Sequence, residues 1–142
     1  MILDGYEKIG CDAINVGHYE LAAGLPFLKK MDTECDIPFI SANLRDAGTG
    51  ELLFDPYVII DRTGLKIGIV GVTAMKPDTM KAVSADDYKT AGNRAIDQIK
   101  HEVDMIAVLV NIERGPQQSL LGTFAEADFI YTSGSTHLTR HT

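Results

Sequence analysis

The chain has 142 residues, of which 45% are hydrophobic and 23% are charged. This length suits one domain with a single buried core, and the composition excludes a disordered or collagen-like chain. The net charge of -7, with no run of Lys and Arg, excludes nucleic acid as a partner. Membrane insertion is excluded too, because apolar stretches such as residues 105–110 are far shorter than a membrane span.

Short runs rich in Ile and Val predict six β-strands. These runs are residues 12–16, 37–42, 57–61, 66–72, 105–110 and 129–132. Their apolar residues are continuous rather than alternating, which is typical of parallel strands that helices cover on both faces. Arg62, Thr63 and Gly64 lie between the third strand and the fourth, a gap too short for a crossover, so that pair is predicted to be a hairpin. The sheet is therefore predicted to be mixed, mostly parallel, with an antiparallel insertion around residues 51–72.

Amphipathic helices are predicted between these strands. They cover residues 20–30, 85–103 and 116–126, and residues 6–9 read as the end of an earlier helix. The longest helix has the clearest pattern, because its apolar residues form one stripe with charged and polar residues opposite. That stripe consists of Tyr88, Ala95, Ile96, Ile99 and Val103. The fold class is therefore α/β, a mixed sheet flanked by helices.

The two cysteines, Cys11 and Cys35, each precede an Asp and a predicted strand. Their spacing fits neither a CxxC pair nor a zinc site. If the two strands are parallel neighbours, both sulfurs lie at the same edge of the sheet. Two interpretations stay open: inert buried thiols, which is usual for free cysteine, or a disulfide, which would indicate an oxidising compartment.

Polar side chains follow three of the predicted strands. His18 follows the first, Asn111 the fifth and His137 the last. Ligands of open α/β sheets collect beyond the carboxyl ends of the strands, and imidazole and amide oxygen can bind divalent cations. The alternative is that these residues are solvated loop residues or helix caps.

Five segments of the chain occur in the order in which 5'-nucleotidases carry them. They read GCDAINVGHYELAAG, DIPFISANL, FDPYVIIDRTGLKIGIVGVT, VDMIAVLVNIERG and ADFIYTSGSTH. From about Gly5 to His137 the chain thus resembles the 5'-nucleotidase and UDP-sugar hydrolase family of calcineurin-like metallophosphoesterases. The resemblance implies half of an αββα sandwich: one partial domain over residues 1–142, with an upstream metal-binding segment absent. It also implies the periplasmic or extracellular location that is common among such relatives.

The chain departs from this family where the chemistry would occur. The family carries Gly-Asn-His-Glu and, two residues later, Asp; the Asn binds metal, and the His and Asp assist the transition state. Here His18 stands at the metal-ligand position, Tyr19 at the catalytic His and Ala22 at the catalytic Asp. A phenol with a pKa of about 10 is a poor substitute for an imidazole that titrates near neutrality. No residue is therefore predicted to be catalytic.

The later ligand positions are altered as well. Asn111 stands where the family has a His, and Ser135 replaces the first His of a Gly-His-x-His pair whose second is kept as His137. The metal candidates implied by the resemblance are thus His18, Asn111 and His137. A two-metal site needs more charged or imidazole ligands than these, so no cofactor is expected.

These departures predict a degenerate metallophosphoesterase domain, inactive as a nucleotidase, with a structural or binding role beside the rest of a longer chain. The alternative is an active phosphoesterase that hydrolyses nucleotide phosphate esters through an altered site. In that case His18, Glu20, Asn111 and His137 would hold one divalent metal such as Mn²⁺, Zn²⁺ or Co²⁺. A nucleotide- or phosphate-binding module is a third hypothesis. The glycines of GIVGVT support it only loosely, because no P-loop Lys follows them.

Overall fold

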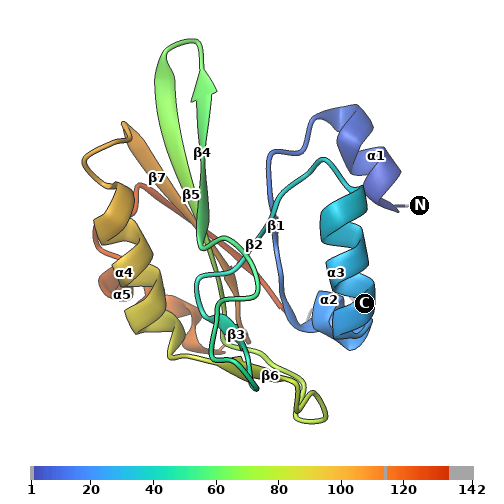
Figure 1. Cartoon of the computed structure of the whole chain (residues 1–142). Helices are drawn as coiled ribbons and strands as arrows, with labels where there is room; N and C mark the ends of the chain where they lie inside the picture. The colour runs from blue at the N-terminus through green and yellow to red at the C-terminus, as the bar shows by residue number, and fades with distance from the viewer. Residues whose placement is uncertain (1, 114, 135–142) are drawn as a thin grey trace, which may run out of the picture.

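The computed structural model describes residues 2–113 and 115–134, which form four layers (Figure 1). Across Figure 1 these are helices α4 and α5, a large sheet, a small sheet, and helices α1 to α3. In chain order the elements are α1 (Ile2–Ile9), β1 (Ile14–Asn15), α2 (His18–Ala22), α3 (Leu25–Glu34), β2 (Phe39–Ile40), β3 (Leu44–Asp46), β4 (Tyr57–Arg62), β5 (Leu65–Thr73), β6 (Val83–Ala85), α4 (Tyr88–Ile99), β7 (Met105–Asn111), a 3-10 turn (Gly115–Ser119), α5 (Leu120–Thr123) and β8 (Phe129–Ser133). No helix in the described ranges is long and apolar enough to cross a membrane.

The large sheet has the order β4-β5-β7-β8. Strand β4 is antiparallel to β5, whereas β5, β7 and β8 are parallel. Thr63 and Gly64 connect β4 to β5 with positive φ values of 55° and 87°, which suits the tight hairpin turn that matches the twist of its strands. The predicted mixed, mostly parallel sheet and its hairpin are confirmed.

The small sheet consists of β1 and β2, which are parallel. It packs against the large sheet, because the side-chain nitrogen of Asn15 donates hydrogen bonds to the carbonyls of Val72 (2.9 Å) and Leu109 (3.2 Å). Gly71 permits this approach: a Cβ there would lie 2.5 Å from Oδ1 of Asn15. Two sheets thus face each other between two helical layers, which confirms the predicted fold class.

Two apolar clusters hold these layers together. The first lies between the large sheet and α4 and α5, and includes Val70, Val108, Ile96 and Phe124. The second lies between the small sheet and α2 and α3. Its buried members are Val16, Leu21, Leu28, Met31, Phe39, Leu44, Phe54 and Val83. Burial of such side chains contributes about 1.5–3 kcal/mol each before the entropy cost of folding is subtracted.

The aspartates that precede the strands have a structural role that sequence reasoning missed. The carboxylate of Asp104 accepts a hydrogen bond from the backbone N–H of Lys66 (2.8 Å), and that of Asp128 accepts one from Ile106 (2.8 Å). Each aspartate therefore ties the beginning of its own strand to the beginning of the neighbouring strand. Asp12 instead pairs with Arg62 of the hairpin.

The predicted helices differ from the observed ones at their ends. The single helix expected over residues 20–30 is two helices, because Gly24 takes a φ of 93° and Pro26 then opens α3. The helix expected over residues 85–103 is shorter, since Asp87 caps it and strand β6 precedes it. Strands β3 and β6 were not predicted; they have only three residues each.

The disulfide left open by the sequence is not formed. Strands β1 and β2 lie side by side as that hypothesis required, but Cys11 is a free thiol whose sulfur lies 3.4 Å from the carbonyl oxygen of Ala13. Cys11 is half-buried, which agrees with the interpretation of a packed thiol.

The cap of α4 gives a testable pH dependence. Hydrogen bonds from the backbone N–H and hydroxyl of Thr90 (2.9 and 2.8 Å) lower the pKa of Asp87 below 3.8. Replacing Asp87→Ala should cost about 1 kcal/mol of stability at neutral pH. Because the pKa is lower in the folded state, this contribution is present above the unfolded pKa and is lost as the pH falls through the folded value.

Thermal unfolding at pH 7 and in acid below pH 3.8 checks this expectation. The difference in melting temperature between the parent and Asp87→Ala should shrink in acid. Asp87→Asn is the matched control, since its amide oxygen still accepts both bonds and cannot titrate in this range. Equal melting temperatures for the parent and Asp87→Ala at pH 7 would contradict the cap.

Candidate functional site

Three polar residues lie side by side at the carboxyl ends of the large sheet. Thr73 of β5, Asn111 of β7 and Ser133 of β8 are opposite one another in register. Asn111 is buried, with 4% of its surface exposed. Its Oδ1 accepts a hydrogen bond from the Thr73 hydroxyl (3.2 Å), and its Nδ2 donates one to the Ser133 hydroxyl (3.2 Å).

Asn111 also holds the beginning of α2. The backbone N–H of His18 donates to Oδ1 of Asn111 at 3.0 Å, across 93 residues of sequence. Gly17 allows this contact, because a Cβ there would lie 2.7 Å from the Asn111 side chain. The Thr73 hydroxyl has one proton to donate, and it lies 3.2 Å from both the Asn111 Oδ1 and the Met75 carbonyl, so the His18 N–H is the fixed donor to this amide oxygen. The structure therefore brings two of the three predicted ligand residues, His18 and Asn111, together. The contact is a hydrogen bond from the His18 backbone, and the two side chains do not line a common cavity.

The residues around His18 belong to the surface of a short helix. The carboxylate of Glu20 accepts a hydrogen bond from the backbone N–H of Gly17 (2.9 Å), which caps the first turn. Tyr19 is 65% exposed, and its ring lies edge-on to that of His18 with centroids 5.5 Å apart. Ala22 is also exposed. The two positions at which the resemblance would place proton transfer thus carry a solvated phenol and a methyl group.

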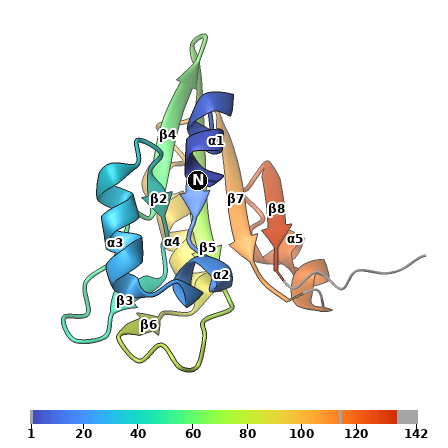
Figure 2. The ribbon, with the colours of Figure 1, turned by 90° about the vertical axis from the view of Figure 1, so that its right-hand side faces the viewer.

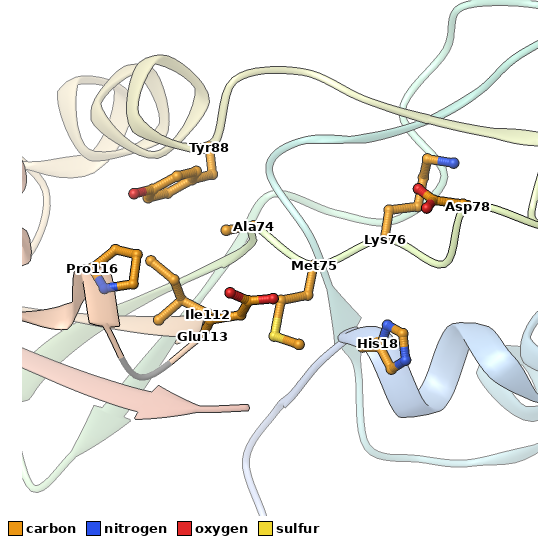
Figure 3. Close-up of a pocket in the computed structure, with 9 residues that line it drawn as sticks. All are labelled: His18, Ala74, Met75, Lys76, Asp78, Tyr88, Ile112, Glu113 and Pro116. Carbon is orange, nitrogen blue, oxygen red and sulfur yellow. The ribbon is translucent and has the colours of Figure 1, made fainter. Parts of the chain in front are cut away.

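A cavity of about 370 Å³ opens beside these carboxyl ends. In Figure 3, His18, Lys76 and Asp78 lie on one side of it, whereas Tyr88 and Pro116 lie on the other. The remaining lining residues are Ala74, Met75, Ile112 and Glu113. Its polar wall therefore mixes positive and negative groups.

Lys76 is held by its own loop. Its Nζ donates hydrogen bonds to the carbonyls of Pro77 (3.3 Å) and Met80 (3.0 Å). Two of its three donors are therefore engaged, and one remains for the cavity. Of the predicted ligand residues that the structure describes, His18 lines this cavity, whereas Asn111 is buried and does not.

Metal binding stays a prediction. Within residues 2–113 and 115–134 no three His, Cys, Asp or Glu side chains gather closely enough to hold a metal ion. His137 and Ser135 lie outside the described residues. The imidazole of His18 can still ligate a cation, whereas the Asn111 oxygen is buried and already accepts a hydrogen bond from the His18 backbone N–H.

Asn43 is a further site residue that sequence reasoning missed. Its Nδ2 donates to the carbonyls of Thr73 (2.7 Å) and Asp86 (3.1 Å), and its Oδ1 accepts from the N–H of Thr73 (3.0 Å). Asn43 thereby fixes the strand end that holds Asn111. A polar residue inside the apolar segment PFISANL is the sequence signal that could have identified it.

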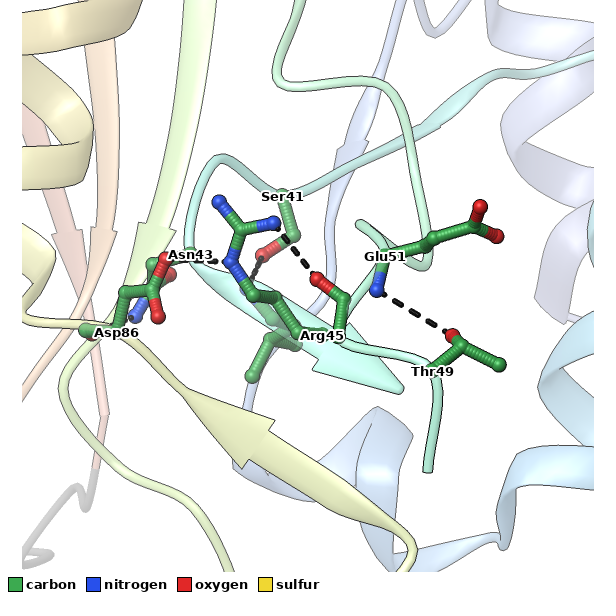
Figure 4. Close-up of polar contacts among 8 residues, drawn as sticks. Ser41, Asn43, Arg45, Thr49, Glu51 and Asp86 are labelled. Carbon is green, nitrogen blue, oxygen red and sulfur yellow. Dashed lines mark hydrogen bonds and ion pairs between the residues drawn. The ribbon is translucent and has the colours of Figure 1, made fainter. Parts of the chain in front are cut away.

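An ion pair supports the same loop from outside. Arg45 of β3 contacts the carboxylate of Asp86 at 2.6 Å and also donates to the carbonyl of Gly50 (2.9 Å) (Figure 4). Figure 4 shows this pair beside Asn43, so one network connects β3, the start of α4 and the end of β5.

Comparisons with known proteins identify the family. No family model matches the chain. The 5'-nucleotidase of Vibrio cholerae is 33% identical over 102 residues, which cover 68% of this chain and 18% of the relative. A 2',3'-cyclic-nucleotide 2'-phosphodiesterase/3'-nucleotidase of Yersinia enterocolitica is 28% identical over 134 residues, 84% of this chain and 20% of the relative. The chain belongs to the 5'-nucleotidase family.

The fold comparison agrees with this membership. A calcineurin-like phosphoesterase of Bacillus subtilis superposes with a TM-score of 0.75 at 24% identity, over 92% of this chain and 47% of that one. The resemblance of this 5'-nucleotidase-family chain to calcineurin-like metallophosphoesterases is confirmed at the level of fold. The chain spans about a fifth of the length of its two curated relatives.

Proposed function

We propose that this 5'-nucleotidase-family chain is a degenerate domain without phosphoesterase activity, which has a structural or binding role in a larger protein. The observation that carries the proposal is the environment of Asn111. Its Oδ1 accepts hydrogen bonds from the His18 backbone and the Thr73 hydroxyl, so the amide works as a buried brace between α2 and the large sheet. A metal ligand at this position would have to be open to the cavity, whereas Asn111 is buried and is not among the residues that line it.

The loss of acid-base groups supports the same proposal. Tyr19 and Ala22 stand at the positions that the family resemblance assigns to proton transfer, and Glu20 caps its own helix. Removing one member of a catalytic unit commonly costs about 10⁴-fold or more in rate. The described residues do not fit a two-metal site.

The alternative function is metal-dependent hydrolysis of nucleotide phosphate esters through a rebuilt site. The observation that favours it is the cavity beside α2, where His18, Asp78 and Glu113 all line one opening. The described residues offer no cluster of three such donors, so the metal would be bound by His18 together with donors outside the described residues, such as His137. The substrate would be a nucleotide phosphate ester, and the metal would bind its phosphate group.

Phosphate release decides between these two functions. The chain should release no phosphate above buffer from AMP or from a bis-aryl phosphodiester with Mn²⁺, Zn²⁺ or Co²⁺ added, because its described residues offer neither a two-metal ligand set nor an acid-base group at the Tyr19 and Ala22 positions. The Vibrio cholerae 5'-nucleotidase serves as the positive control. Metal-dependent turnover that His18→Ala abolishes would support the alternative. His101→Ala, at an exposed position outside the cavity lining, is the matched control and should change nothing in either case.

A further inference from the structure

Another cavity lies outside the site described above. It has a volume of about 290 Å³ and shares no lining residue with the cavity beside α2. Three segments form it: helix α3, the residues at the beginning of β2, and the residues that lead into β4. Figure 2 shows α3 on the β2 side of the small sheet, so this cavity lies at that side of the sheet. Six of its eight lining residues are apolar, and the other two are Asp32 and Asp55. We call it the Asp32–Asp55 cavity.

Two buried rings form the innermost apolar part of this cavity. Phe39 and Phe54 are 4% and 6% exposed, and their rings are tilted against each other with centroids 6.2 Å apart. Both rings belong to the apolar cluster between the small sheet and helices α2 and α3, so the core holds them in place. Leu52, which also lines the cavity, is 38% exposed. An apolar ligand group can therefore remove Leu52 from water without any movement of the core.

The two carboxylates have no counter-charge in this cavity. Asp32 and Asp55 are exposed, and neither side chain forms a hydrogen bond or an ion pair with the residues that the structure describes. The lining contains no basic residue, and Lys30 of α3 lies 4.0 Å from Glu34 instead. The position of Asp55 is fixed by its backbone, since its carbonyl accepts a hydrogen bond from the N–H of Ser41 (2.9 Å). An apolar cavity with two uncompensated negative charges is complementary to an apolar group that carries a positive charge.

We propose that the Asp32–Asp55 cavity binds a small organic cation, namely a primary ammonium or guanidinium group on a short apolar body. The apolar body packs on Phe39, Phe54 and Leu52. The cationic group donates charge-assisted hydrogen bonds to Asp32 and Asp55, and the nearby aromatic rings add cation–π attraction.

The size and the lining of the cavity decide against other ligands. Ligand cavities commonly have volumes of about 300–1,000 Å³, so this one suits a small free molecule rather than a polypeptide segment. A hydrated metal ion is unsuited to a mostly apolar lining, and the described residues form no cluster of three metal-ligating side chains. Because the cavity lies outside the site beside α2, this inference does not depend on the proposed lack of phosphoesterase activity.

Titration with 2-phenylethylamine, a primary amine on an aromatic body, tests this site. In amide NMR spectra of the isotope-labelled chain, we expect saturable shifts for Asp32 and for residues 52–55, with a dissociation constant of about 1 mM or lower. The alcohol 2-phenylethanol has the same apolar body and a neutral head group. It should bind at least about tenfold more weakly, because charge-assisted hydrogen bonds are roughly twice as strong as neutral ones.

A pair of double variants tests the role of the two carboxylates. Asp32→Asn with Asp55→Asn removes both charges from exposed positions and keeps the side-chain shapes. This variant should bind 2-phenylethylamine at least about tenfold more weakly than the parent and should bind 2-phenylethanol equally well. Asp97→Asn with Glu126→Gln is the matched control, because it removes the same number of charges outside the cavity lining. The control should bind the amine as the parent does, and melting temperatures show that each variant is folded.

Several results would overturn the proposal. The first is the absence of a saturable shift at about 10 mM amine, or shifts confined to residues outside the lining. The second is equal binding of 2-phenylethanol, or unchanged binding of the amine by the variant without Asp32 and Asp55. The third is a lysine-containing peptide that shifts the signals of the lining when no free amine does, because the cavity then binds a protein. None of these measurements follows phosphate release, so this inference and the proposed function can fail separately.

Discussion

Replacing Asn111→Leu should lower the free energy of unfolding by about 1–3 kcal/mol, because the His18 backbone N–H loses its acceptor. The Thr73 hydroxyl also loses Oδ1, but it can donate to the Met75 carbonyl instead, which lies 3.2 Å away. Leucine has the same number and branching of side-chain heavy atoms as asparagine, so the substitution leaves no cavity. Urea unfolding followed by circular dichroism measures the loss of stability.

The matched control for this substitution is Asn111→Asp. One carboxylate oxygen can accept from the His18 N–H and the Thr73 hydroxyl, and the other from the Ser133 hydroxyl. Asn111→Asp should therefore lose less stability than Asn111→Leu. A loss equally large in both variants would show that the contacts of the amide nitrogen, rather than the acceptors on Oδ1, carry the stabilisation.

The Asn111→Leu variant also distinguishes a structural role of Asn111 from a role as a metal ligand. If the role is structural, Asn111→Leu should lose the same free energy of unfolding in EDTA and in Mn²⁺. A ligand predicts no loss in EDTA, and removal of a Mn²⁺-dependent rise in melting temperature that the parent shows. The second pattern would contradict the proposed role of Asn111 and revive the alternative function.

The fold could be predicted from the sequence where local patterns decide it. Continuous apolar runs after Asp104 and Asp128 indicate buried parallel strands, and the short gap around Thr63 and Gly64 permits only a hairpin. Helix ends were less predictable, because a positive φ at Gly24 and the capping bonds of Asp87 depend on neighbouring turns. Local residue patterns alone predicted one mixed sheet and not a separate small sheet, since the fit of Asn15 against Gly71 depends on contacts 56 residues apart.

The site was harder to predict than the fold. Residue type identifies Asn111 as a potential ligand, but it does not show whether its oxygen is already engaged. That engagement comes from His18 and Thr73, which are 93 and 38 residues away in sequence. Residue type likewise does not show that the Glu20 carboxylate already accepts a hydrogen bond from the backbone N–H of Gly17 at 2.9 Å. The metal prediction for His137 stays a prediction, because this residue lies outside the described ranges.

Replacing Phe124→Ala should cost about 3–5 kcal/mol of stability, which is typical of removing a fully buried aromatic ring. Phe124 is 1% exposed and packs against Tyr88 and the middle of α4. Leu121→Ala, at an exposed position of α5 three residues earlier, is the control and should change stability by less than about 0.5 kcal/mol. Equal effects of the two substitutions would contradict the packing of α5 against the sheet.

A double-mutant cycle identifies the contact responsible for this cost. A Cβ at Gly92 would lie 2.6 Å from the ring of Phe124, so Gly92→Ala alone should be destabilising. In the Phe124→Ala background that clash is gone, and alanine within a helix is favoured over glycine by about 1 kcal/mol. Gly92→Ala should then become neutral or stabilising, which gives a coupling free energy above about 1 kcal/mol between the two sites. Additive effects would mean that Gly92 is required for another neighbour, such as Val72, which lies 3.2 Å from the same Cβ position.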